Sequence, residues 1–376
     1  MQLPYSDKLN IGHLSRLFAN TTNCYKFFWF LAILKSVDGH SNRFSFEALI
    51  NEMIVEAWYM VTEYHLSLGP IGSSDNLEEV IKYIFENYHI SSSEKREKIL
   101  DFLSTTEDKK IKKYKSDLTL NVPYRLQAPF YDEITIERNM WNSTKEYLTN
   151  EINRQSKLIY YFVTASGLGT VIEVDKCWAE YFVQHNEILK CWTQLKLIQY
   201  LQKRNPSVPG IADKIEPPAS REIERVRKYW KLVLEVDPSI KDIYGHFDMS
   251  EEVISVDHFV PWQYVAHDEL WNLHPTTKSI NSSKSNSLPA WDIYFDALGN
   301  IEYRAYELMS TNDAVKHEYN KIAPYHLNNQ EIRTQLYSVG LDRSEFKSRL
   351  ENVVKPVYDS ARIHGFNEWI YKGCKL

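Results

Sequence analysis

A proline-rich segment near the middle of the chain limits most strongly what this sequence can fold into. Residues 205–219 contain four prolines and one glycine. Proline lacks the backbone N–H that helices and central strands use, and glycine weakens both elements, so neither is expected to run through this stretch. We therefore predict a domain boundary here. A chain of 376 residues has room for one domain over residues 1–205 and a second over residues 220–376.

Apolar residues recur at helical spacing through most of the chain. The most apolar run, Tyr25–Val37, is interrupted by two lysines and is shorter than the roughly 20 residues of a membrane span, so it predicts a buried core helix rather than membrane insertion. A hairpin is expected within residues 158–174, where two strand-like runs flank a Ser-Gly-Leu-Gly turn. The other expectations are helices over 44–66, 77–88, 93–103 and 176–203, an extended stretch over 118–131, and a largely helical region after 303 that breaks or kinks at Pro356.

The charge of the chain bears on its partners. A hydrophobic content of 43% is ample for large cores, and the net charge of −6 counts against strong autonomous binding to nucleic acid. Local basic patches or a bound divalent metal remain compatible with this charge. Five lysines within residues 109–115 are either a solvated face or a phosphate-backbone contact. Four scattered cysteines and a start without signal-peptide features predict a cytoplasmic protein with reduced thiols.

The chemistry is concentrated in residues 256–289, VDHFVPWQYVAHDELWNLHPTTKSINSSKSNSLP. Hydrolysis of a phosphodiester needs a base that takes a proton from water and a metal that stabilises charge on the phosphate. His258 can be the base because a neutral imidazole accepts a proton near neutral pH. Asp257 and Asn281 offer oxygen ligands of the kind Mg²⁺ prefers. We expect a β-hairpin over residues 243–261 with its turn at 248–252, and Asp257 and His258 at the end of its second strand-like run.

This segment resembles the ββα-metal fold of HNH nucleases, and most of all the HNH domain of CRISPR type II effector nucleases. The likeness rests on the Val-Asp-His run and on a proline two residues beyond the following Phe. Fifteen positions separate Asp257 from Asn272, nine more lead to Asn281, and Lys284 precedes a Leu-Pro pair. The resemblance implies a mostly α fold with a small α+β module, in which a helical N-terminal domain precedes an HNH module, with its core over residues 243–290, flanked by helices.

The resemblance also implies roles for individual residues. His258 would be the general base, and Asp257 and Asn281 would hold Mg²⁺ or Mn²⁺. Asn272 would brace the loop and orient His258, and Lys284 would contact the phosphate near the cleaved bond. The last motif position is Asn281 rather than His, a form found in part of the family. Many relatives carry a structural zinc at this point, but the two cysteine positions hold Thr and Ile here, so no zinc is expected.

Two further histidines lie near the motif, and their roles are open. His246 falls on the expected first strand of the hairpin and could face the metal or the phosphate. His274 follows Asn272 by two positions and could contact the substrate.

Three functions compete at this point. The first is a DNA endonuclease of bacterial restriction or anti-phage defence, which nicks one strand per catalytic centre and is licensed by a partner protein. The second is an RNase that uses the same centre, and the third is a catalytically silent HNH scaffold. The sequence leaves the oligomeric state open.

Overall fold

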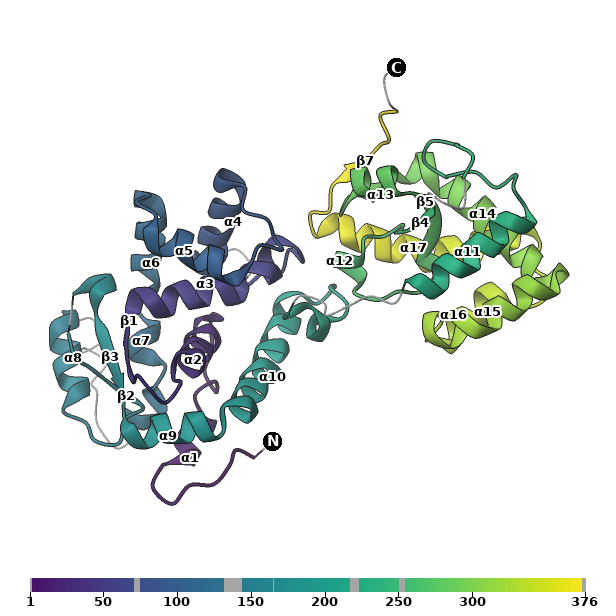
Figure 1. Ribbon diagram of the computed structural model, residues 1–376. Helices are drawn as coiled ribbons and strands as arrows, with labels where there is room; N and C mark the ends of the chain where they lie inside the picture. Colours follow the sequence, from purple (N-terminus) through teal and green to yellow (C-terminus); the bar gives the residue numbers. More distant parts are fainter. Residues whose placement is uncertain are drawn as a thin grey trace. The chain divides into compact units, whose positions relative to one another are not determined.

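The computed structural model of the protein describes residues 2–70, 75–131, 144–164, 166–216, 223–249 and 254–373. The chain divides into two compact units, which are treated separately here (Figure 1). Unit 1 comprises Met1–Pro206 and Lys214–Pro217, and unit 2 comprises Ser207–Asp213 and Pro218–Leu376. Both units are mostly helical with small sheets, and unit 2 contains the ββα module, so the predicted fold class is confirmed.

Unit 1 is built from helices and one small sheet. The helices are α1 (Ile11–Ser15), α2 (Tyr25–Ser36), α3 (Phe46–Thr62), α4 (Asn76–Tyr88), α5 (Arg96–Thr105), α6 (Lys109–Leu118), α7 (Val122–Arg125), α8 (Lys145–Asn153), α9 (Lys176–Gln184) and α10 (Asn186–Arg204), with 3₁₀ turns η1 (Ala128–Tyr131) and η3 (Gly167–Gly169). A further 3₁₀ turn, η4 (Ile211–Lys214), lies where the chain passes between the units.

Helix α2 forms the centre of unit 1. Eight consecutive residues, Phe27–Leu34, are buried, and the helix packs against α3 and α10. A helix that is apolar on every side has to be surrounded by protein, so the expected core helix is confirmed. None of the helices in the described part of the chain combines the length and apolarity needed to cross a bilayer.

The sheet of unit 1 contains the expected hairpin. Strand β2 (Tyr160–Phe162) pairs antiparallel with β3 (Val171–Val174), and η3 lies in the turn between them. Strand β1 (Arg43–Ser45) pairs with the other edge of β3. The sequence did not indicate β1, because a three-residue strand has too few positions to show an alternating pattern.

Two expectations for unit 1 are wrong. The stretch 118–131 is not extended but holds α7 and η1, because Pro123 lies in the first turn of α7, where the missing N–H costs nothing. The single helix over 176–203 is divided into α9 and α10 at His185, whose ψ of 22° leaves helical geometry. The side chain of Asn186 donates to the carbonyl of Leu34 at 2.7 Å, a tertiary contact that local periodicity cannot reveal.

Unit 2 places one short antiparallel strand pair among helices (Figure 1). Its elements are α11 (Glu224–Val236), β4 (Ile254–His258), α12 (Trp262–Val265), η5 (Leu270–Asn272), β5 (Leu273–Thr277), α13 (Lys278–Lys284), β6 (Leu288–Pro289), α14 (Trp291–Thr311), α15 (Asp313–His326), α16 (Gln330–Tyr337), α17 (Arg343–Ile363) and β7 (Glu368–Trp369). Strands β6 and β7 pair in parallel, which joins the end of unit 2 to the region after α13.

The expected hairpin over residues 243–261 is wrong. Strand β4 pairs with β5, and its predicted partner segment forms a tight turn instead. The carboxylate of Asp242 accepts hydrogen bonds from the backbone N–H groups of Tyr244 (3.0 Å) and Gly245 (2.6 Å), and a side chain that bonds to the backbone two residues on favours a turn over a strand. The expected turn at 248–252 lies largely outside the described residues.

Helix α17 does not end at Pro356 but continues to Ile363. Pro356 is exposed, so the carbonyl that its missing N–H leaves without a partner can bond to water. Leu350, Val354 and Tyr358 are buried on the opposite face, and their packing holds the helix together on both sides of the proline.

A buried carboxyl on α14 makes the stability of unit 2 depend on pH. Glu302 is 4% exposed, its Oε1 has no hydrogen-bond partner, and burial raises the pKa of its carboxyl well above the usual value. The folded state therefore keeps the proton to a higher pH than the unfolded state. The contribution of Glu302 to the free energy of unfolding is fully present below the pKa of the unfolded state, about 4.3. As the pH rises above that value, the free energy of unfolding falls by up to about 1.4 kcal/mol per pH unit.

We expect Glu302→Gln to remove this loss, because an amide of the same shape cannot ionise. The free energy of unfolding, measured in urea between pH 5 and pH 8, should favour the variant increasingly as pH rises. Glu307→Gln is the matched control, because Glu307 lies on the same helix with a side chain that is 39% exposed. Parallel pH profiles for wild type and Glu302→Gln would contradict the burial argument.

Candidate functional site

The motif residues meet where β4, β5 and α13 join. Asp257 and His258 end β4 and pair with His274 and Leu273 of β5. Helix α13 follows β5 directly and packs on both strands. Thr277 and Ile280 occupy the two positions where zinc ligands occur in relatives. The Thr277 hydroxyl caps α13 by accepting a hydrogen bond from the N–H of Ile280 (3.3 Å), and the Ile280 side chain is buried. Local capping and packing thus fix the helix that carries Asn281 and Lys284.

Asp257 is a buried carboxylate with partners on both oxygens. It is 4% exposed. The hydroxyl of Tyr244 donates to Oδ2 at 2.7 Å, and the ammonium of Lys284 donates to Oδ1 at 3.1 Å. Lys284 also donates to the backbone carbonyl of His258 at 2.8 Å. Because an unpaired buried charge is costly, Lys284 ties α13 to the end of β4.

His274 supports this arrangement from inside. It is fully buried, and its Nε2 lies 3.1 Å from the Tyr244 hydroxyl and 3.7 Å from Asp257 Oδ2. Burial lowers the pKa of His274 to about 4, so the ring is neutral at pH 7 and donates from Nε2 to the Tyr244 oxygen. The idea that His274 contacts the substrate is therefore wrong, since the side chain has no exposed surface.

Asn272 closes the loop between β4 and β5. The side chain is fully buried; its Oδ1 accepts from the N–H of Val260 at 2.7 Å, and its Nδ2 donates to the carbonyl of Val260 at 2.9 Å. The backbone carbonyl of Asn272 accepts from the N–H of Phe259 at 2.9 Å. These three bonds fix the backbone immediately after His258.

His258 has an acidic partner that the sequence did not single out. Its Nε2 lies 2.7 Å from Oδ1 of Asp268, in the irregular stretch between α12 and η5. A carboxylate beside an imidazole fixes the ring orientation and stabilises the protonated ring. When the neutral ring of His258 donates from Nε2 to Asp268, its lone pair is on Nδ1, and Nδ1 is then the atom that can accept a proton. The sequence did contain one signal for this partner, since Asp268 is an acidic residue in the loop after the Asp-His pair. The sequence did not show, however, how the loop folds back toward His258.

Four of the predicted site residues line one pocket of about 370 Å³, namely Asp257, His258, Asn281 and Lys284. Asn272 is not in its lining and acts through the backbone of the loop. The exposed His246, which lies in the turn made by Asp242 with a φ of 56°, is also not among the described residues of the lining. The structure therefore gives no support to a role for His246 at this pocket.

The donor set of the pocket fits a hydrated divalent cation. The amide nitrogen of Asn281 donates to Ser255 Oγ (2.9 Å) and to the carbonyl of Val256 (3.1 Å), which leaves the amide oxygen as its ligand atom. Within the described residues, no group of three or more His, Cys, Asp or Glu could hold a metal. Mg²⁺ keeps several waters and uses one or two protein oxygens, so Asp257 and Asn281 suffice. The Lys284 ammonium already lies beside Asp257, where positive charge is favoured.

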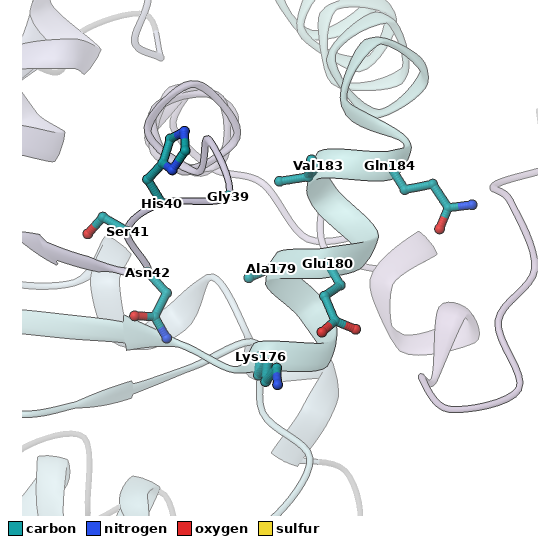
Figure 2. Close-up of a pocket in the computed structure, with 9 residues that line it drawn as sticks. All are labelled: Gly39, His40, Ser41, Asn42, Lys176, Ala179, Glu180, Val183 and Gln184. Atoms are coloured by element: carbon teal, nitrogen blue, oxygen red, sulfur yellow. The ribbon is translucent and has the colours of Figure 1, made fainter.

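A second pocket lies in unit 1, between the α2–β1 turn and α9 (Figure 2). Its titratable side chains are His40, Lys176 and Glu180, and all three are exposed. Figure 2 shows His40 on the turn and Glu180 on the facing helix. Because nothing desolvates or orients these groups, the pocket offers no arrangement comparable to that of Asp257, His258 and Asp268.

Comparison with known proteins identifies the module. Residues 243–290 match the family model described as HNH endonuclease. The chain contains an HNH endonuclease domain. No curated protein and no solved structure matches the chain. HNH nucleases act on nucleic acids and generally use divalent metal ions, so the HNH domain supports a nuclease function that uses a divalent metal.

Lys284 and a metal ion would compete for Asp257. We expect Lys284→Met to lower the melting temperature without metal, because Asp257 is then buried without a countercharge. Mg²⁺ or Mn²⁺ should raise the melting temperature more in the variant than in wild type, since removing a charge 3.1 Å from Oδ1 should tighten binding at least about tenfold.

The measurement is a titration of each ion followed by differential scanning fluorimetry. Lys278→Met is the matched control, because Lys278 is exposed on the same helix. The absence of any metal-dependent stabilisation in Lys284→Met would argue against Asp257 as a ligand.

Proposed function

We propose that the protein is a metal-dependent DNA endonuclease that hydrolyses one phosphodiester bond per visit and so nicks one strand. The observation that carries this proposal is that His258, which lines the same pocket as Asp257 and Asn281, is paired with Asp268 outside the lining at 2.7 Å. A base aimed by a carboxylate, beside two oxygen donors suited to a cation, is what phosphodiester hydrolysis requires.

Each residue then has a chemical task. His258 accepts the proton of the attacking water, and Asp268 stabilises the imidazolium that results. Lys284 is only 1% exposed but, unlike His274, it lines the pocket. It uses two of its three N–H donors within the protein, and the third would serve a phosphate oxygen that enters the pocket. Mg²⁺ or Mn²⁺ held by Asp257 and Asn281 would stabilise charge on the phosphate as the bond to the leaving oxygen breaks.

A role in bacterial restriction or anti-phage defence is part of the proposal. The acidic chain and its large helical unit 1 fit a cytoplasmic effector whose cutting is licensed by a partner protein. RNA is the alternative substrate, because a water activated by His258 does not need a 2′-hydroxyl.

Cleavage of supercoiled plasmid tests the proposal. With Mg²⁺ or Mn²⁺, wild type should convert the plasmid to open circles, and His258→Ala should reduce the rate by about 10²–10⁴-fold through loss of the base. His246→Ala is the matched control, because His246 is exposed and lies outside the pocket lining. Cleavage of RNA alone in a parallel digest would support the RNase. No cleavage of either polymer despite metal binding would leave two explanations, the silent scaffold and the absence of the licensing partner.

Helix α11 supplies the basic surface nearest to this pocket. Val226, Trp230 and Val233 are buried, and the helix packs against β4, β5 and α15. The cationic side chains on its other faces are Arg225, Arg227, Lys228 and Lys231, of which Arg227 lines the pocket. A row of cations beginning at the catalytic pocket fits the phosphates that flank a cleaved bond.

The lysine run of α6 is a weaker candidate for this contact. Lys115 is buried and pairs with Glu47 at 2.7 Å, and Lys112 pairs with Glu107 at 2.5 Å. Arg227 of α11 is also paired, with Glu224 at 2.8 Å, so ion pairing does not separate the two helices. We assign the phosphate contact to α11 because Arg227 lines the pocket that contains His258.

The salt dependence of DNA binding distinguishes a phosphate contact on α11 from one on α6. We expect Lys228→Glu/Lys231→Glu to weaken binding to a short DNA duplex and to reduce the slope of log K against log [salt] by about 2, because each lost phosphate contact removes about 0.9. Fluorescence anisotropy with catalytically silent His258→Ala protein measures this. Lys109→Glu/Lys113→Glu makes the same charge change on exposed positions of α6. An equal change of slope in both double variants would contradict a local track on α11.

A further inference from the structure

Helices outside the HNH match hold the loop that carries Asp268. His326, the last residue of α15, donates from Nδ1 to the backbone carbonyl of Asp268 at 2.7 Å. Two residues later, Asn328 donates to Oε1 of Glu269 from its backbone N–H (3.1 Å) and from its side chain (2.9 Å). Three hydrogen bonds therefore join two consecutive loop residues to the connection between α15 and α16, called here the α15–α16 corner (His326–Asn329).

The part of the loop around Asp268 contains no helix or strand. Asn272 fixes its beginning at Val260, whereas residues 266–269 are irregular between α12 and η5. The carboxylate of Asp268 lies on this irregular stretch and contacts His258 at 2.7 Å. Holding the backbone of Asp268 and the side chain of Glu269 therefore sets where the Asp268 carboxylate meets the imidazole.

The side chains that make these contacts are buried. His326 is 3% exposed and Glu269 is 8% exposed. Loss of a hydrogen bond at a buried polar group costs more than at an exposed one, so these bonds hold the loop firmly.

The geometry points to the α15–α16 corner as a positioning device for the catalytic base. His326 and Asn328 are positioning residues that act through Asp268 and Glu269, and neither is placed in contact with the substrate. The inference rests on the proposed function of His258 as the base. It extends the catalytic part of unit 2 beyond residues 243–290, to helices that the HNH match does not include. A displacement of about 1 Å in a catalytic group can cost about 10²-fold in rate.

Cleavage kinetics of neighbouring variants test the inference. We expect His326→Ala and Asn328→Ala to lower kcat by about 10–100-fold, with the KM for DNA within about twofold of wild type. Asn329→Ala is the matched control, because Asn329 caps α16 by accepting from the N–H groups of Glu331 (2.8 Å) and Ile332 (3.2 Å) and bonds to neither loop residue. This variant should keep the wild-type kcat although it weakens the same corner.

Conservative replacement and a spectroscopic reading complete the test. His326→Asn places an amide donor near the position of Nδ1 and should restore most of the lost kcat. In ¹⁵N-histidine spectra of the full chain, the Nε2 signal of His258 should change in His326→Ala and stay unchanged in Asn329→Ala, whether or not the DNA is cut. The spectra do not require cleavage, so they decide the role of the corner even where the isolated wild type, without its licensing partner, cuts no DNA. Equal kcat and equal spectra for His326→Ala, Asn328→Ala and Asn329→Ala would overturn the inference.

Discussion

A carboxylate buried at the end of β4 has to be neutralised from within the protein, and the surrounding elements of unit 2 are arranged around this requirement. Asp257 receives the ammonium of Lys284 from α13 and the hydroxyl of Tyr244 from the turn before β4. Tyr244 is in turn held by ring contacts with Tyr294 of α14 and Trp369 of β7. One buried charge thus connects the strand pair to α13, α14 and β7, and removing Lys284 would leave it without a countercharge.

The same arrangement makes the pocket responsive to a second cation. In the structure the Lys284 ammonium bonds to the carboxylate oxygen that a metal would also use, while the amide oxygen of Asn281 lies on the same pocket. In the proposed mechanism, Asp257 would link folding to cation binding. His258 lines the same pocket, but its ring is oriented separately, through Asp268 and the α15–α16 corner. Different parts of unit 2 would then stabilise the charge on the phosphate and orient the base.

The sequence predicted the motif residues better than their surroundings. Fixed spacing among Asp257, Asn272 and Asn281 is a local property, and it identified the HNH domain and the residues that come together. The strand partner of β4 and the carboxylate that meets His258 depend on how the loop over residues 259–272 folds back, and that depends on Asn272 and on helices more than fifty residues away. The continuation of α17 through Pro356 has the same origin, because packing of its buried face outweighs a local signal. The roles assigned to the individual motif residues remain predictions.

The central claim is that Asp257 and Asn281 hold a divalent cation in the pocket that also contains His258. The most direct measurement is an anomalous difference map from crystals of the full chain grown with Mn²⁺. The account requires a peak within bonding distance of a carboxylate oxygen of Asp257 and the amide oxygen of Asn281, with the Lys284 ammonium moved away from the shared oxygen. A peak elsewhere in the protein, or an empty pocket with Lys284 still bound to Asp257 in crystals that cut DNA, would contradict it.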